Sequence, residues 1–324
     1  MGFQNSAPRF DDINLFLRSL DIWTQRADAA MITTEPPWAK LLAGESPVKY
    51  AIDNYKGLVD YYRSKNLKLW IYLDPQNGLE RTQDVAELVA AGKSIAQPEI
   101  QKIFRRFAII MDSLYKPEHL GLALETNLIR GATTATIYNG VVKAANDDAA
   151  DIKARKSSAK LSVSVQADFA WGKLQGTSYQ GINKDFIDFP FIEELGISSY
   201  PYLAFDKPSD IPVDYSSRLT EGKNLSVFIS EGGWASQSVT SPARVFSSSP
   251  QAQADYISHH ASLLDRANAT AVFQLLFIDV DLAAIPTNVS PNILLFTTIG
   301  MVDTQFQPKP ALAIWDNVFA RPLK

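Results

Sequence analysis

The chain contains no cysteine and only three histidines, His119, His259 and His260, among its 324 residues. The absence of cysteine excludes disulfides, thiolate catalysis and cysteine-ligated metals. His259 and His260 fall within a helical pattern, and His119 begins an apolar run. No histidine is therefore placed for a Ser-His-Asp triad.

Other signatures are also missing. No apolar run reaches the roughly 18 residues that a membrane-spanning helix needs, so we expect no membrane insertion. The 31 basic and 35 acidic residues give a net charge of −4 without long runs, so we expect no nucleic-acid partner. We expect a monomer. Neither G-x-G-x-x-G nor G-x-x-x-x-G-K-[ST] occurs, which disfavours the main rival architecture, an open doubly wound sheet that binds nucleotides.

The composition, 46% hydrophobic and 20% charged, is that of an ordinary globular protein. The length suits one α/β barrel. The first residues, MGFQNSAP, begin almost inside a strand. We therefore expect that an export signal has been removed and that the protein is secreted or periplasmic.

Short apolar runs alternate with amphipathic helical segments along the chain. Helical spacing is found at 12–25, 47–65, 94–114, 132–158, 186–195, 215–222, 251–268 and 310–319. Strands are expected at the N-terminus and at 29–33, 67–73, 120–124, 161–166, 196–200, 225–230 and 271–278. Eight such units predict an α/β fold with a parallel sheet. We expect a single (β/α)8 TIM barrel over residues 1–324, with its first strand at the extreme N-terminus.

Two of the predicted strands end in a carboxylate. LSVFISEGGW at 225–234 carries Glu231, and HLGLALETN at 119–127 carries Glu125. A barrel enzyme has its active site at the C-terminal ends of the strands. Two carboxylates are the minimum for cleaving a glycosidic bond, and their surroundings can give them different pKa values. One strand-end glutamate alone is more often a helix cap, so the pair carries the argument.

The remaining residues at the strand ends are acidic, amide or aromatic, with almost no cations. Phosphate ligands need arginine, lysine or a glycine-rich loop, whereas sugars need aromatic faces and hydroxyl partners. The candidate sugar platforms are Trp38, Trp171 and Trp234. The candidate binders of hydroxyl groups are Asp74, Asn127, Gln166 and Gln274, with Tyr200 and Tyr202 after the sixth strand. We expect no cofactor and no metal. A calcium site from Asp279, Asp281 and either Glu35 or Asp74 is an alternative, but its spacing matches no loop motif.

Three motifs carry a family resemblance. ISEGGW at 229–234 resembles the strand-seven nucleophile motif of clan A glycoside hydrolases. GISSYPY at 196–202 is similar to the sixth strand of family 53, the endo-β-1,4-galactanases, and GMVDTQFQPKPAL at 300–312 is similar to the clan's closing segment. The resemblance implies a retaining hydrolase in which Glu231 is the nucleophile and Glu125 the acid/base. It also implies that Tyr200 donates a hydrogen bond to the nucleophile.

The chain departs from the clan pattern at three places. Leu124 occupies the position of the asparagine that usually precedes the acid/base, with Asn127 as a possible substitute. Residues 32–35 lack the strand-two arginine, and no tryptophan ends the eighth strand. Three hypotheses follow: a retaining hydrolase of β-linked oligo- or polysaccharides, a non-catalytic carbohydrate-binding barrel, and a lyase or isomerase that uses a divalent metal.

Overall fold

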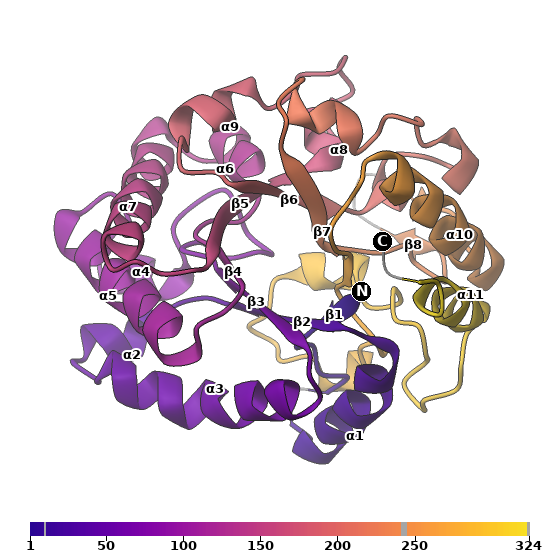
Figure 1. The fold of residues 1–324 in the computed structure, drawn as a ribbon, viewed down its shortest axis with the longest axis horizontal. Coiled ribbons are helices and arrows are strands. Elements are labelled where there is room, and N and C mark those ends of the chain that lie inside the picture. Colours follow the sequence, from indigo (N-terminus) through magenta and orange to yellow (C-terminus); the bar gives the residue numbers. More distant parts are fainter. Residues whose placement is uncertain (10, 241–244, 323–324) are drawn as a thin grey trace. The chain divides into compact units, whose positions relative to one another are not determined.

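The computed structural model describes residues 1–9, 11–240 and 245–322. Eight parallel strands are hydrogen-bonded in the order β10-β1-β2-β3-β4-β5-β6-β7, which confirms the predicted (β/α)8 barrel (Figure 1). The strands are β1 (Gly2–Gln4), β2 (Ala29–Thr34), β3 (Lys68–Leu73), β4 (His119–Gly121), β5 (Lys160–Gln166), β6 (Glu194–Ser199), β7 (Ser226–Gly232) and β10 (Phe273–Gln274). A separate two-stranded sheet is formed by β8 (Val239–Thr240) and β9 (Val245–Phe246).

Helices alternate with the strands. The α-helices are α1 (Ile13–Trp23), α2 (Trp38–Leu42), α3 (Pro47–Ser64), α4 (Ala86–Ala90), α5 (Pro98–Tyr115), α6 (Thr126–Ala132), α7 (Ala135–Ala154), α8 (Ala167–Ala170), α9 (Asn183–Asp188), α10 (Pro250–Arg266) and α11 (Pro310–Phe319). Short 3-10 turns lie at 24–26, 201–203, 208–210, 217–220, 282–284 and 291–295.

The chain forms two compact units. The first comprises residues 1–30, 167–181 and 197–324, and the second comprises residues 31–166 and 182–196. The single-domain organisation of residues 1–324 stays a prediction.

The second unit is built on β3, β4 and β5, with α3, α5 and α7 on their outer side (Figure 1). The strands are apolar because both of their faces are covered. Helix α5 turns an apolar stripe inward, and its Phe104, Phe107 and Met111 are fully buried. Helix α3 begins where it does because Ser46 accepts a hydrogen bond from the Lys49 N–H and Pro47 occupies the first turn.

The first unit contains β1, β7 and β10. The Gly2 N–H donates to the Val272 carbonyl at 2.9 Å, the Thr270 N–H to Val227 at 2.9 Å, and the Leu275 N–H to Gly232 at 3.0 Å. The last two bonds join β7 to the segment around β10, which are the two ends of the strand order. Phe3 packs against the rings of Trp23, Phe277 and Trp315. Trp23 and Trp315 are core residues, and so is Trp70 in the other unit.

Several predicted elements differ from the structure. The helix predicted at 186–195 ends at Asp188, because residues before a proline disfavour the helical conformation and Pro190 follows. The helix predicted at 132–158 is α7, and the short helix α6 that precedes it was not predicted. The predicted helix at 215–222 is a 3-10 turn at Ser217–Thr220. Strands β4 and β10 are also shorter than predicted.

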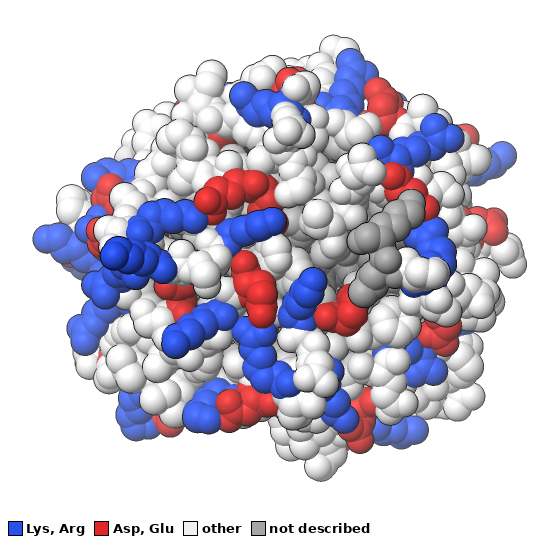
Figure 2. All heavy atoms as spheres, in the orientation of Figure 1, with Lys and Arg blue, Asp and Glu red and all other residues white. Residues whose placement is uncertain are grey.

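The surface is mixed in charge. Figure 2 shows acidic and basic side chains interspersed on the face that it displays. Four lysine–aspartate pairs lie one helical turn apart: Lys49–Asp53, Lys56–Asp60, Lys143–Asp147 and Lys184–Asp188. Among the described residues, no helix is both long and apolar enough to span a membrane.

Candidate active site

Glu125 lies where the chain leaves β4 and enters α6. Its backbone is left-handed, with φ 50° and ψ 45°, which costs roughly 1–2 kcal/mol for a residue other than glycine. The Glu125 N–H donates to the Ser164 hydroxyl at 2.9 Å, and the Glu125 carbonyl accepts from the Ile129 N–H at 2.9 Å. Strained backbone held by its surroundings is typical of functional sites. The position therefore fits the predicted catalytic role, which stays a prediction.

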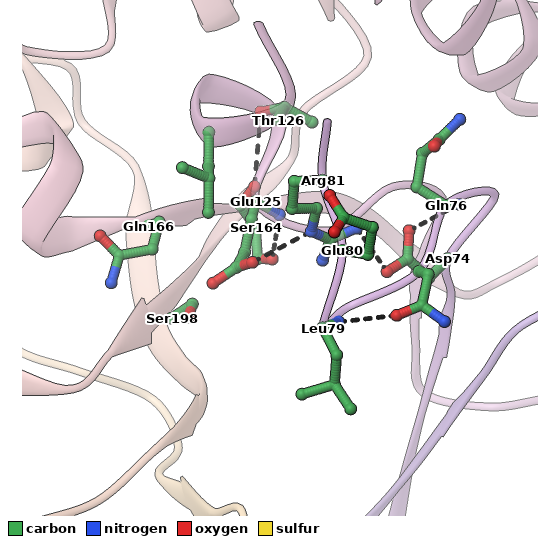
Figure 3. Close-up of polar contacts among 12 residues, drawn as sticks. Asp74, Gln76, Leu79, Glu80, Arg81, Glu125, Thr126, Ser164, Gln166 and Ser198 are labelled. Carbon is green, nitrogen blue, oxygen red and sulfur yellow. Dashed lines mark hydrogen bonds and ion pairs between the residues drawn. The ribbon is translucent and has the colours of Figure 1, made fainter. Parts of the chain in front are cut away.

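The side chain of Arg81 joins Glu125 to Asp74 (Figure 3). Its Nε donates to Glu125 Oε2 at 3.2 Å and its Nη1 to Asp74 Oδ2 at 2.7 Å. All three side chains are at most 7% exposed. Sequence analysis did not identify Arg81. We expected almost no cations at the strand ends, and this expectation is wrong because Arg81 contacts two of the carboxylates there. No local signal identifies this arginine, because it lies in a loop well after the end of β3.

Two further carboxyl groups share this part of the second unit. Asp74 ends β3, and its Oδ1 also accepts the Gln76 N–H at 3.0 Å. Burial raises the pKa of Asp74 to about 6, against the opposing charge of Arg81. Burial and the nearby Asp74 charge raise the pKa of Glu35, which follows β2, to about 8. At neutral pH, Glu35 therefore holds a proton.

Asn127 is hydrogen-bonded to the backbone. Its Nδ2 donates to the Gln166 carbonyl at 2.9 Å, and its Oδ1 accepts the Gln166 N–H at 2.8 Å and the Leu128 N–H at 3.0 Å. The side chain is 1% exposed and links α6 to the end of β5. These bonds give Asn127 a structural role. The predicted binding of a sugar hydroxyl by Asn127 or by the Gln166 side chain stays a prediction.

Glu231 lies near the end of β7 in the first unit. Ser198 Oγ donates to Glu231 Oε1 at 3.0 Å, and Gln4 Nε2 donates to the Ser230 carbonyl at 2.9 Å and lies 3.5 Å from Glu231 Oε2. Gly232 follows because a Cβ at this position would lie 2.5 Å from the Ser199 carbonyl oxygen. Sequence reasoning missed both Ser198 and Gln4. Gln4 could have been found, since it is the polar residue that ends the first strand.

Tyr200 is anchored by a buried carboxylate. Its N–H donates to Asp168 Oδ2 at 3.1 Å, and the Tyr215 hydroxyl donates to Asp168 Oδ1 at 2.6 Å. The Tyr200 ring packs on Phe296 with centroids 4.7 Å apart. These contacts fix the backbone that follows β6. The predicted hydrogen bond from Tyr200 to Glu231 stays a prediction.

The indoles predicted as sugar platforms are packed in the interior. Trp38 is 1% exposed and lies beside Phe104, with ring centroids 6.3 Å apart. Trp171 is 8% exposed, stacks on Tyr215 and donates its Nε1–H to the Tyr215 carbonyl at 3.0 Å. Neither indole offers an open face to a sugar, so the prediction is corrected for both.

Trp234 and Tyr202 are corrected in the same way. Trp234 is 1% exposed, donates to Ser248 Oγ at 2.9 Å and packs against Tyr202 and Tyr256. The Tyr202 hydroxyl donates to the Leu295 carbonyl at 2.5 Å. Aromatic residues with satisfied polar ends are what a protein core requires. Trp234 and Tyr202 therefore belong to the core.

Gln274, at the end of β10, is 2% exposed, and its Oε1 accepts no hydrogen bond from the described residues. Unsatisfied buried acceptors are uncommon. The binding role predicted for Gln274 stays a prediction.

The carboxylates of the calcium alternative have partners within the chain. Asp279 accepts from Lys309 Nζ at 2.6 Å and from the Gly300 N–H at 3.0 Å, and Asp281 accepts from Arg9 Nη1 at 2.6 Å. Over the described residues, no group of three or more His, Asp or Glu side chains is arranged to hold a metal ion.

Comparison with solved structures supports the architecture. A β-glucosidase from Thermotoga maritima, in complex with azafagomine, superposes with a TM-score of 0.64 at 12% identity, covering 94% of this chain and 86% of that one. The family 1 β-glucosidase from the same organism has a TM-score of 0.64, 14% identity and the same coverage. A β-glucuronidase from Ruminococcus gnavus has a TM-score of 0.59 and 11% identity, covering 99% of this chain and 49% of that one.

These likenesses show the fold. No protein-family model matches the chain, and a search of curated proteins finds no match.

Proposed function

We propose that the protein is a retaining glycoside hydrolase that cleaves β-linked oligo- or polysaccharides. The observation that carries the proposal is the pair of glutamates at the ends of β4 and β7, each hydrogen-bonded within its own unit. The barrel is also the fold of β-glucosidases and β-glucuronidases. The motif GISSYPY, which is similar to family 53, points to a β-galactan within this class.

The proposed reaction has two steps. First, the Glu231 carboxylate attacks the anomeric carbon while the bond to the leaving oxygen breaks, and protonated Glu125 gives its proton to that oxygen. The product is a glycosyl ester on Glu231. Glu125, now a carboxylate, then takes a proton from water as the water oxygen attacks the anomeric carbon, and Glu231 leaves as a carboxylate.

The charges favour a neutral sugar over a uronide. In the second unit, Arg81 is already shared between two carboxylates, so it is poorly placed to neutralise a carboxylate on the substrate. We therefore expect kcat/KM for an aryl β-galactoside or β-glucoside to exceed that for the matching β-glucuronide. Comparable or better turnover of the glucuronide would refute this preference.

Glu231→Gln is the decisive variant. It keeps the size of the side chain and its ability to accept from Ser198, but it removes the nucleophile. We expect turnover of aryl β-glycosides to be abolished while the circular dichroism spectrum and melting temperature stay close to those of the wild type. Glu99→Gln, on the exposed face of α5, is the matched control and should keep wild-type turnover. A Glu231→Gln variant with near wild-type activity would reject the proposal.

A second candidate is a carbohydrate-binding barrel without catalysis. It is favoured by Leu124 in place of the clan's asparagine and by the commitment of the Asn127 amide to the backbone. Titration calorimetry with galactan and glucan oligosaccharides distinguishes the two. Binding without product after days of incubation would support the second candidate, whereas product formation that depends on Glu231 would exclude it.

A further inference from the structure

Residues 74–84 form the loop that connects β3 to α4 and carries Arg81 (Figure 3). Successive side chains cap the loop's own backbone. Asp74 accepts from the Gln76 N–H at 3.0 Å, Asn77 from the Leu79 N–H at 2.8 Å, and Glu80 from the Thr82 N–H at 2.9 Å. Side chains that cap nearby N–H groups in this way fix turns.

The loop is also fixed to the structure that follows it. Asp84 Oδ1 accepts the Ile95 N–H at 3.0 Å and lies 3.4 Å from Gln76 Nε2. Asp84 is 6% exposed and Gln76 is fully buried. The backbone on both sides of Arg81 is thus fixed. The Arg81 side chain, which is 6% exposed, therefore has a defined direction.

The guanidinium uses two different nitrogens for its two carboxylate partners. Nη1 faces Asp74 and Nε faces Glu125. Only arginine offers donors in such a rigid planar fork, because a lysine ammonium is a single point. Asp74 therefore orients the fork, and the fork orients the Glu125 carboxylate, whose left-handed backbone is fixed independently by Ser164.

We propose that Arg81 is a positioning residue that holds the orientation of the Glu125 carboxylate. For catalysis, this inference rests on the proposed glycosidase function. Glu125 must direct one oxygen at the leaving group in the first step and at water in the second, so a rotated carboxylate would slow both steps.

The first test needs no substrate. Glutamate labelled with ¹³C at the side-chain carboxyl is incorporated into the wild type, Arg81→Lys and Arg81→Met, and Glu125→Gln assigns the Glu125 resonance. At a fixed pH, we expect the Glu125 carboxyl resonance to shift and broaden in Arg81→Met, because the fork that holds the carboxylate in one orientation is gone. Arg81→Lys should give a smaller change.

Arg63→Met is the matched control, since it removes an arginine that pairs with a different glutamate, Glu118. It should leave the Glu125 resonance unchanged. A wild-type Glu125 resonance in both Arg81 variants would overturn the proposal. If Arg81→Met does not fold, Arg81→Lys decides: a wild-type resonance refutes the proposal, and a shifted or broadened resonance supports it.

The second test uses activity. On an aryl β-glycoside, kcat should fall more than KM rises in Arg81→Lys, because the substrate still binds but the carboxylate is misdirected. A variant in which KM rises and kcat is unchanged would refute positioning. If the wild type hydrolyses no β-glycoside, the proposed function fails, while the Glu125 resonance still decides whether Arg81 holds that carboxylate.

Discussion

Replacing Glu35 by glutamine removes a carboxyl group whose pKa is raised from 4.5 to about 8 in the folded protein by burial and by the charge of Asp74. Between these two values, the folded state keeps a proton that the unfolded state has released. Unfolding therefore releases a proton, and the stability of the wild type falls as pH rises through this window. The glutamine variant has no such proton and should not show this component.

The size of the effect follows from the two pKa values. A shift of one pKa unit corresponds to about 1.4 kcal/mol, and most of the range between the two pKa values of Glu35 lies between pH 5 and pH 8. The free energy of unfolding of the wild type therefore falls by roughly 3 kcal/mol over that range because of Glu35. Urea unfolding at the two pH values measures it. The difference in the free energy of unfolding between Glu35→Gln and the wild type should shift in favour of the variant by roughly 3 kcal/mol from pH 5 to pH 8.

Glu45→Gln serves as the control, and it should follow the wild type at both pH values. Parallel pH dependence of the wild type and Glu35→Gln would refute the reasoning. It would mean that Glu35 ionises normally and that the carboxyl groups near Arg81 are better solvated than the structure shows.

Three further predictions concern single features. Asn127→Ala should lower the free energy of unfolding by about 1–3 kcal/mol, because it leaves the buried N–H and C=O of Gln166 without their partner; an unchanged urea midpoint would contradict the structural role of this amide. Burial lowers the pKa of His260 from 6.5 to about 3, so the unfolded state binds the extra proton and stability is lost as pH falls below about 6.5. His260→Phe retains an aromatic ring against Tyr256. Between pH 7 and pH 5, its free energy of unfolding, measured with urea, should therefore fall by about 2 kcal/mol less than that of the wild type; an equal fall would contradict the effect of burial on His260. Finally, incubation with a chelator followed by gel filtration should leave the rate of β-glycoside hydrolysis unchanged, and a rate restored only by a divalent metal would instead support a metal-dependent barrel enzyme.

The architecture could be predicted because strand and helix patterns are local. The apolar runs before Glu125 and Glu231 are buried strands, and the spacing of Phe104, Phe107 and Met111 predicts the inward face of α5. Boundaries were predicted less well. The helix predicted at 132–158 corresponds to α7, but α6 before it was missed, because seven residues are too few to show a helical period.

The partners of the site residues could not be predicted, because they depend on side-chain direction. A tryptophan at a strand end can face a ligand or the core, and Trp38 and Trp234 face the core. Asn127 has the right chemistry for a sugar hydroxyl but is used by the backbone. Arg81 became visible as a partner of Glu125 only once the loop after β3 was folded.

The distance between the Glu125 and Glu231 carboxyl groups in a crystal structure tests the proposed mechanism most directly, since it can be measured before the sugar is identified. The retaining two-glutamate mechanism predicts a separation of about 5–5.5 Å with both groups in one open cleft. A separation of about 6.5–9.5 Å would indicate inversion instead. A still larger distance, or either carboxylate turned away from the mouth of the barrel, would contradict the glycosidase proposal.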